Sequence, residues 1–123
     1  LPILKESRVR WLQGDSTNAG LPMRIANQWG DIEFDIVIDD GAHWPEANEL
    51  TFKNIFPMTR GAYYIEDVFP LDKMQPTRWT ASQPDKYDIM KYYRFLDALG
   101  EHTIWDNRRN KEPDSYIIKV TND

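Results

Sequence analysis

The chain has 123 residues, of which 41% are hydrophobic and 28% charged, enough for one small globular domain with its own core. Its formal net charge of -5 argues against a surface that binds nucleic acid or anionic lipid. The chain has no cysteine, which excludes disulfides and thiolate chemistry; any metal must take carboxylate, histidine, carbonyl or water ligands, as a hard cation such as Mg²⁺ does.

No apolar run is long enough to span a membrane, and no signal peptide is visible. We therefore expect no membrane partner and a cytoplasmic location.

The first elements in chain order are a strand and a helix. Alternating polar and apolar residues predict a strand over residues 8–13, which stops at a turn over residues 14–17. Apolar residues recur every four positions between 18 and 29, which predicts a helix there.

Two apolar runs and an intervening helix predict a strand–helix–strand crossover. The run over 34–38 is nearly continuous, as in a strand buried on both faces of a parallel α/β sheet. A helix is expected to open at Trp44-Pro45-Glu46, and a second buried strand follows over 62–65. The expected inward face of this helix comprises Ala47, Leu50, Thr51 and Ile55, with Phe52 and Phe56 as further candidates.

The rest of the chain predicts a loop, a helix and a hairpin. Residues 68–84 contain three prolines and are expected to form a loop over the strand ends, as lids and binding loops do. A helix is expected over 85–99, followed by antiparallel strands at about 102–106 and 115–120. The expected apolar stripe of the helix comprises Ile89, Tyr93 and Leu96, joined by Tyr92 and Leu99.

Both buried strands end in an acidic pair, Asp39-Asp40 and Glu66-Asp67. The carboxyl ends of neighbouring parallel strands meet at one edge of a sheet, so these carboxylates are expected to converge. Carboxylates this close repel one another unless they are protonated or bridged by a cation, which favours a divalent metal. His43 lies at the same rim, where a neutral imidazole could take a proton from a hydroxyl group polarised by that metal.

Purely structural roles are also possible for these residues. Asp39 or Asp40 could cap the helix at Trp44, and Asp67 could bind loop amides. Asp15 could equally cap a helix or accept a hydrogen bond from a ligand. His102 is expected to be structural. For Trp79, Trp105 and Tyr116, packing is favoured over stacking on a bound ring.

Four segments carry a resemblance to a known family. Residues 34–43 (FDIVIDDGAH), 51–57 (TFKNIFP) and 61–67 (GAYYIED) resemble the later half of class I S-adenosylmethionine-dependent methyltransferases. The resemblance is to the metal-dependent sugar O-methyltransferases of macrolide biosynthesis, of the mycinamicin and macrocin types, and to their relatives near the cephalosporin hydroxylases. Residues 8–16 (RVRWLQGDS) resemble the strand and turn that precede these motifs.

The resemblance implies a Rossmann-like methyltransferase sheet with a C-terminal antiparallel hairpin, and S-adenosylmethionine and Mg²⁺ as cofactors. It implies a small-molecule acceptor with a hydroxyl group, on a sugar or another natural product. The residues assigned by it are His43 as general base, Asp40, Glu66 and Asp67 as Mg²⁺ ligands, Asp15 near the adenine ring, and Gly14 and Asp39 as further cofactor contacts.

The sequence also departs from the family pattern. Ala42 replaces a common serine and Ala62 a common second glycine, and neither change removes a catalytic group. No glycine-rich strand–turn–helix of the cofactor site is present, and residues 8–13 already match the third strand of the family's 3-2-1-4-5-7-6 order. We therefore expect a single domain, residues 1–123, that corresponds to the latter part of a catalytic domain and lacks its first two strands.

Two other functions remain open. Missing central strands would expose sheet edges, so the chain could be a non-catalytic truncated domain that forms homo-oligomers. A metal-dependent hydrolase or phosphotransferase is less favoured, because the sequence has neither a P-loop nor a nucleophilic serine elbow.

Overall fold

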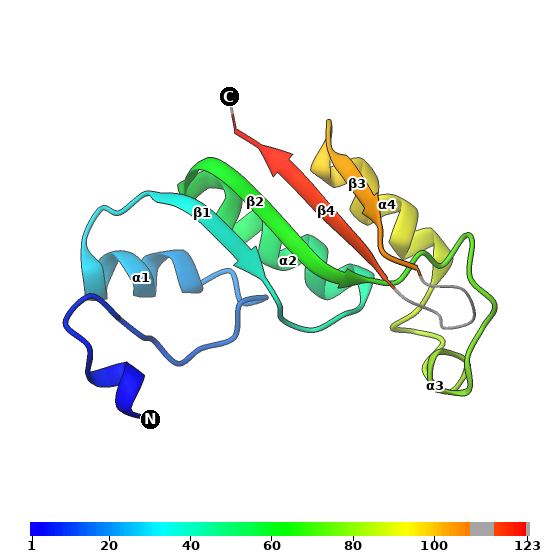
Figure 1. The fold of residues 1–123 in the computed structure, drawn as a ribbon, viewed down its shortest axis with the longest axis horizontal. Helices are drawn as coiled ribbons and strands as arrows, with labels where there is room; N and C mark the ends of the chain where they lie inside the picture. Colours follow the sequence, from blue (N-terminus) through cyan, green and yellow to red (C-terminus); the bar gives the residue numbers. More distant parts are fainter. Residues whose placement is uncertain (109–114, 123) are drawn as a thin grey trace.

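The computed structural model describes residues 1–108 and 115–122, shown in Figure 1. Its elements, in chain order, are η1 (Pro2–Lys5), α1 (Leu21–Trp29), β1 (Phe34–Asp39), α2 (Pro45–Ile55), η2 (Phe56–Met58), β2 (Thr59–Val68), α3 (Arg78–Ala81), α4 (Ile89–Leu99), β3 (Thr103–Asp106) and β4 (Tyr116–Thr121).

The strands form one sheet in the order β1-β2-β4-β3. β1 and β2 are parallel, with Val37 opposite Tyr63 and Asp39 opposite Ile65, and α2 connects them. β4 is antiparallel to both β2 and β3. The predicted α/β class is therefore confirmed, with its strand–helix–strand crossover and its C-terminal hairpin. Most of the predicted hairpin loop lies outside the described residues.

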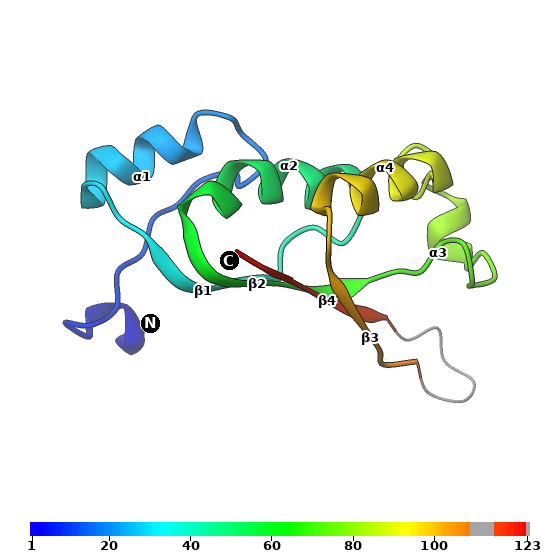
Figure 2. The same cartoon turned by 90° about the horizontal axis from the view of Figure 1, so that it is seen from above.

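The main helices share one side of the sheet. Figure 2 shows α1, α2 and α4 together above the strands. Between the helices and the sheet lies the core, which includes Phe52 and Ile55 of α2, Tyr92, Phe95 and Leu99 of α4, and Tyr63, Ile65, Ile118 and Val120 of the strands. The two larger helices are thus fixed against the strands whose ends carry the acidic pairs.

The buried faces of the helices differ in part from those predicted. Ile89 and Tyr93 are 41% and 46% exposed, and Phe95, which was not predicted, is fully buried. In α2, Leu50 is 39% exposed. Apolar residues occur on more than one side of each helix, so periodicity alone did not identify which side packs against the sheet.

The strand predicted over residues 8–13 is wrong. These residues belong to no strand. The sheet of the described chain begins at β1, and an extended segment becomes a strand only when a neighbour pairs with its backbone groups. The helix predicted next to it is confirmed as α1.

β1 is an edge strand with one open face. Among residues 1–108 and 115–122 it pairs only with β2, and Ile36 and Ile38 are 63% and 62% exposed. The prediction that the strand over residues 34–38 is buried on both faces is therefore wrong. Within residues 1–108 and 115–122, no helix covers the face of the sheet that lies opposite α2 (Figure 2). In the same ranges, no helix combines the length and apolar character needed to cross a membrane.

Gly61 allows β2 to approach β1 closely. A Cβ at this position would collide with the backbone carbonyl of Asp35. We expect Gly61→Ala to lower the free energy of unfolding by about 1–3 kcal/mol, because the parallel pair would have to separate. Chemical denaturation would measure the loss. Gly20→Ala is the control, since its methyl would meet only the side-chain oxygen of Asn18, at 3.1 Å. Equal stability of the two variants would contradict the expectation.

A buried carboxylate links α2 to α4. Glu49 accepts hydrogen bonds from Lys53 Nζ at 2.7 Å and Arg94 Nε at 3.1 Å. Burial alone would raise the pKa of Glu49, but hydrogen bonds and charge from these two cations outweigh it and hold the pKa below its ordinary value of 4.5.

This pairing makes part of the stability depend on pH. Since the folded-state pKa of Glu49 is lowered, its contribution is present above pH 4.5 and is lost as the pH falls through the folded-state pKa. We expect Glu49→Gln to cost about 1–2 kcal/mol at pH 7, with a smaller difference from the native chain at lower pH. Denaturant titrations across this pH range would measure it, with exposed Glu33→Gln as control. A difference independent of pH would contradict the assignment.

Candidate active site

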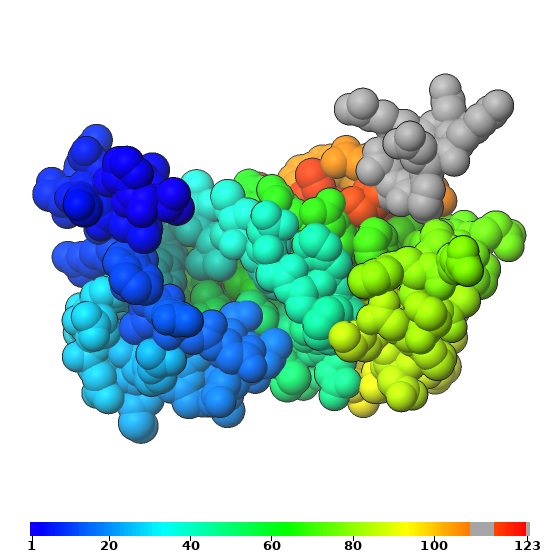
Figure 3. All heavy atoms as spheres, turned by 90° about the horizontal axis from the view of Figure 1, so that it is seen from below, coloured from blue at the N-terminus to red at the C-terminus, as the bar shows by residue number. Residues whose placement is uncertain are grey.

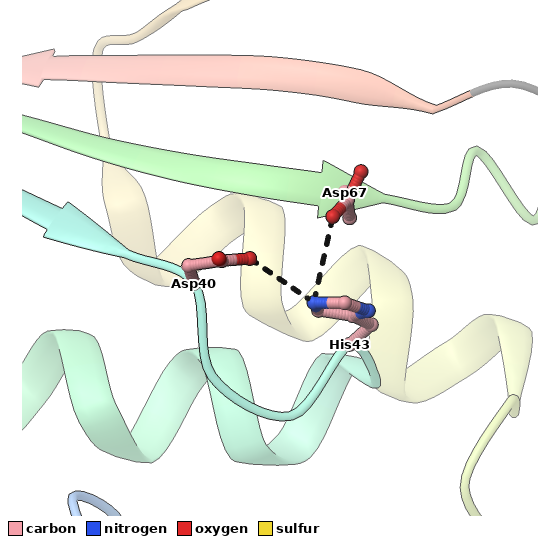
Figure 4. A group of neighbouring side chains, drawn as sticks. All are labelled: Asp40, His43 and Asp67. Carbon is pink, nitrogen blue, oxygen red and sulfur yellow. Dashed lines mark ion pairs between the residues drawn. The ribbon is translucent and has the colours of Figure 1, made fainter. Parts of the chain in front are cut away.

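The ends of β1 and β2 bring three ionisable side chains together. Asp40 and His43 lie in the loop between β1 and α2, and Asp67 lies near the end of β2 (Figure 4). His43 Nε2 is 3.5 Å from an Asp40 oxygen and 3.6 Å from an Asp67 oxygen. One potential ligand atom from each of the three lies within 4.8 Å of the others. The predicted convergence of the two strand ends is therefore present in the folded chain.

Within the part of the chain that the structure describes, the imidazole nitrogen at the centre of this group has no hydrogen-bond partner. His43 Nε2 is buried, although the whole side chain is 35% exposed. Buried polar atoms are normally paired, so this nitrogen is available to a ligand hydroxyl group or to a cation. The two carboxylates fit a hard divalent cation, which prefers oxygen ligands.

The backbone at Asp67 departs from a regular strand. Its φ is 54°, the left-handed region that few residues other than glycine adopt. The register of β2 against β4 shifts between Ile65, which pairs with Ile118, and Val68, which pairs with Tyr116. β2 therefore has one extra residue in this interval, as in a β-bulge. Bulges of this kind redirect side chains, and here the Asp67 carboxylate points at His43 (Figure 4).

Glu66 does not join the group formed by Asp40, His43 and Asp67. It is partly buried and immediately precedes Asp67 in β2. Successive side chains of a strand point to opposite faces of the sheet. Ile65 packs in the core beneath the helices, so Glu66 is expected on the other face.

Asp39 supports the loop that carries Asp40 and His43. Its side chain is 7% exposed and accepts hydrogen bonds from the backbone N–H of Gly41 at 3.0 Å and the hydroxyl of Tyr63 at 3.4 Å. Burial raises the pKa of Asp39, and burial together with the adjacent carboxylate raises that of Tyr63. The residue therefore shapes the turn, and its predicted contact with the cofactor stays a prediction.

The helix-capping alternative for Asp39 and Asp40 is wrong. The N-cap of α2 is Trp44, and no side chain caps that end. Trp44 is extended, as expected for a residue before proline, so Pro45 begins the helix immediately after the site loop. Asn48, in the first turns of α2, donates a hydrogen bond to the carbonyl of Ala42 at 3.2 Å and further fixes this loop.

Asp15 lies in a turn beside the site loop, outside the three-residue group. Its Oδ1 accepts hydrogen bonds from the hydroxyl and backbone N–H of Thr17, which lower the pKa of Asp15. Asp15 does not cap α1, whose N-cap is Gly20. Ser16 bonds to Thr51 of α2 at 2.8 Å, and its hydroxyl lies 4.0 Å from the position a Cβ would take at Gly41. The turn of Gly14 and Asp15 is thus held next to the site loop.

Known proteins similar to this chain are O-methyltransferases. No protein-family profile matches the chain. It is 43% identical over 68 residues to the 8-demethyl-8-(2-methoxy-alpha-L-rhamnosyl)-tetracenomycin-C 3'-O-methyltransferase of Streptomyces olivaceus, covering 54% of the chain and 17% of that protein. It is 41% identical over 81 residues to the mycinamicin VI 2''-O-methyltransferase of Micromonospora griseorubida, covering 64% of the chain and 17% of that protein. The demethylmacrocin O-methyltransferase of Streptomyces fradiae is 37% identical over 82 residues, covering 65% of the chain and 18% of that protein.

A solved structure agrees with these sequences. The MycE methyltransferase of the mycinamycin biosynthetic pathway, in complex with Mg and SAH, matches the whole chain with a TM-score of 0.52 and 26% identity. The chain is homologous to O-methyltransferases of the mycinamicin, macrocin and tetracenomycin type. The predicted resemblance and the Rossmann-like methyltransferase fold are confirmed. The chain spans 36% of the MycE chain.

Within this methyltransferase-like fold, sequence reasoning missed the aromatic surroundings of His43. The ring of Phe69 lies edge-on to His43, with centroids 6.4 Å apart, and Tyr87 lies 5.8 Å beyond Phe69. Lys86 Nζ lies 4.2 Å from the ring centre of Trp44. The only signal in the sequence was that aromatic residues follow the acidic pair of β2 and precede α4. The predicted loop 68–84 thus runs beside the site, and α3 is a short helix within it. Figure 3 shows the site loop at the surface, between the N-terminal segments and this segment.

Proposed function

We propose that the chain supplies the metal-binding and acceptor-binding part of an S-adenosylmethionine-dependent O-methyltransferase. The observation that carries this proposal is the group of Asp40, His43 and Asp67 at the ends of two parallel strands. The proposal is also supported by homology to O-methyltransferases and by the fold shared with a methyltransferase solved with Mg and SAH. The acceptor would be a hydroxyl group of a small molecule, on a sugar or another natural product.

Asp40 and Asp67 would hold Mg²⁺, with Glu66 as a third ligand from the adjacent position in β2. Their carboxylates suit the preference of this cation for oxygen. When bound, Mg²⁺ would polarise the acceptor hydroxyl and make its proton easier to remove. The left-handed backbone at Asp67 supports this role, because strained residues persist where the surrounding structure holds them for a function.

His43 would act as the general base. Its Nε2 has no hydrogen-bond partner among residues 1–108 and 115–122, and it lies 3.5 Å from an Asp40 oxygen and 3.6 Å from an Asp67 oxygen. Nε2 would accept the proton of the acceptor hydroxyl, whose oxygen is then ready to attack an electrophilic methyl group in line. S-adenosylmethionine supplies such a methyl group on its sulfonium.

The methyl donor would bind along the same edge, near the turn of Gly14 and Asp15 and the loop after Asp39. The chain carries no glycine-rich strand–turn–helix for the rest of that ligand, and the edge of β1 is open. We therefore propose that residues 1–123 correspond to the latter part of a catalytic domain, and that alone they bind S-adenosylmethionine weakly. A cytoplasmic location and the absence of nucleic-acid binding also stay predictions.

Two titrations test the proposal on the chain itself. Calorimetry with MgCl₂ should give a single site, and Mn²⁺ should selectively broaden the NMR signals of His43 and its neighbours. Calorimetry with S-adenosylmethionine should show weak or no binding. Absence of metal binding would remove the basis of the proposal. Micromolar binding of S-adenosylmethionine would contradict the assignment of the chain to the latter part of a domain.

The open edge favours one alternative, a non-catalytic domain that self-associates. In the structure as described, without residues 109–114 and 123, β1 pairs on one side only and exposes Ile36 and Ile38. Exposed apolar edges pair readily with a second chain. Sedimentation should then show a dimer that Ile38→Lys weakens, whereas a monomer at high concentration would exclude this alternative.

A further inference from the structure

Asp67 faces the candidate active site through one of its two carboxylate oxygens. Its Oδ2 lies 3.6 Å from His43 Nε2. The side chain of Asp67 is 51% exposed, so packing alone does little to hold it in one rotamer. Exposed side chains without a fixed partner exchange between rotamers within nanoseconds. A second contact is therefore required to keep Oδ2 directed at the imidazole.

The other oxygen of Asp67 makes such a contact. The hydroxyl of Ser115 donates a hydrogen bond to Asp67 Oδ1 at 3.1 Å. Ser115 is 6% exposed, so this hydroxyl is largely shielded from water. A hydrogen bond to an ionised acceptor is stronger than one between neutral groups. The two oxygens of Asp67 thus have different neighbours, with Oδ1 bonded to Ser115 and Oδ2 facing His43.

The C-terminal hairpin sets the position of Ser115. The residue directly precedes β4, and its carbonyl accepts a hydrogen bond from the backbone N–H of Asn107 at 3.2 Å. The neighbouring pair, Asp106 and Tyr116, belongs to the ladder of β3 and β4. The hydroxyl is therefore held by two paired strands that carry none of the three side chains of the candidate active site.

The backbone of Asp67 gives this contact a further role. A φ of 54° is unfavourable for a residue other than glycine, and such conformations persist where neighbouring groups hold them. The hydrogen bond from Ser115 reaches Asp67 at the point where the register of β2 against β4 shifts. It therefore links the irregular end of β2 to the start of β4.

We propose that Ser115 is a positioning residue for the metal site, because its hydroxyl orients Asp67 so that Oδ2 points toward His43. This inference rests on the proposed function and gives the hairpin of β3 and β4 a part in it. Asp67 would then bind the cation through a single oxygen. Removing a residue that hydrogen-bonds to a metal ligand typically lowers metal affinity by about 10–100-fold.

Two substitutions of Ser115 test this role. Ser115→Ala removes the hydroxyl and should weaken Mg²⁺ binding, measured by calorimetric titration with MgCl₂, by at least about tenfold. Ser115→Thr keeps a hydroxyl on the same carbon and should recover most of that affinity. Thermal unfolding of both variants shows whether they are folded. An equal loss of affinity in the two variants would overturn the inference.

Thr59→Val is the matched control. Thr59 is 1% exposed at the other end of β2, where its hydroxyl donates a hydrogen bond to the carbonyl of Ile55 at 3.1 Å. The substitution removes a buried hydroxyl and keeps the shape of the side chain. It should lower the thermal stability and leave Mg²⁺ affinity unchanged. If Thr59→Val weakens Mg²⁺ binding as much as Ser115→Ala does, the effect of Ser115 is not specific and the inference fails.

A measurement without metal reads the orientation of Asp67 directly. Three-bond NMR couplings from its Cγ to the backbone nitrogen and carbonyl carbon report the χ1 rotamer. We expect one rotamer in the native chain and in Ser115→Thr, and an average over several rotamers in Ser115→Ala. A rotamer of Asp67 that is unchanged in Ser115→Ala would overturn the inference.

The titrations separate this inference from the proposed function. If the native chain and Ser115→Ala bind Mg²⁺ equally well, Ser115 has no positioning role and the proposed function stands. If the native chain binds no Mg²⁺, the proposed function fails, and the positioning role fails with it whatever the couplings show.

Discussion

Asp67→Asn should weaken Mg²⁺ binding by at least about 10–100-fold while the fold stays intact. Removing a residue that only hydrogen-bonds to a metal ligand typically lowers metal affinity by about 10–100-fold. Asp67 is proposed as a ligand itself, so its removal should lower the affinity at least as much. Asparagine tolerates the left-handed backbone found here, with φ 54°, and keeps an oxygen for the Ser115 hydroxyl, which donates to Asp67 at 3.1 Å. The substitution therefore removes the charge and little else.

Asp35→Asn is the matched control for this prediction. It removes the same charge from β1, but its partner is Arg60 on the neighbouring strand. It lies five residues before Asp40, about 16 Å along an extended chain. Calorimetric titration with MgCl₂ and thermal unfolding of both variants would give affinity and stability together. If Asp67→Asn binds Mg²⁺ as the native chain does, the metal site is not at the end of β2.

The parts of the site that sequence could predict depend on local chemistry. Pro45 fixed the start of α2, and the abrupt change from apolar residues to Asp39-Asp40 and Glu66-Asp67 marked where both strands end. Parallel pairing then brought the two acidic ends together, because the carboxyl ends of neighbouring strands meet. These inferences need only the neighbours of a residue in the chain.

The parts that sequence could not predict depend on tertiary neighbours. The alternation over residues 8–13 is typical of a strand, but no strand in the described part of the chain pairs with this segment. The bulge that turns Asp67 toward His43 arises from the pairing of β2 with β4, and the sequence of β2 carries no glycine there to signal a positive φ. The sequence also could not show that Asp39 is buried and accepts a hydrogen bond from Tyr63, which reaches it from the next strand.

His43→Gln, made in the complete catalytic domain to which we propose this chain belongs, should lower kcat for methyl transfer by about 10²–10⁴-fold, the usual contribution of a general base. Glutamine keeps a polar side chain of similar reach, so the loop after β1 should retain its shape. If Asp40 and Asp67 hold the metal, the dissociation constant for Mg²⁺ should change by no more than about threefold. Imidazole added in solution should restore part of the activity, because the variant lacks only the proton acceptor.

The metal titration distinguishes the two roles that the geometry allows for this imidazole. His43 Nε2 lies close enough to the carboxylates of Asp40 and Asp67 to bind the same cation. It could therefore be a metal ligand instead of a base. A ligand role predicts that His43→Gln weakens Mg²⁺ binding as strongly as Asp67→Asn does, with no rescue by imidazole. His102→Gln is the control, since His102 is only partly buried and its ring nitrogen contacts the carbonyl of Gly100 at 2.7 Å, remote from the β1 and β2 ends. Because the metal affinity is read on the chain without a methyl donor, this result decides the role of His43 independently of turnover.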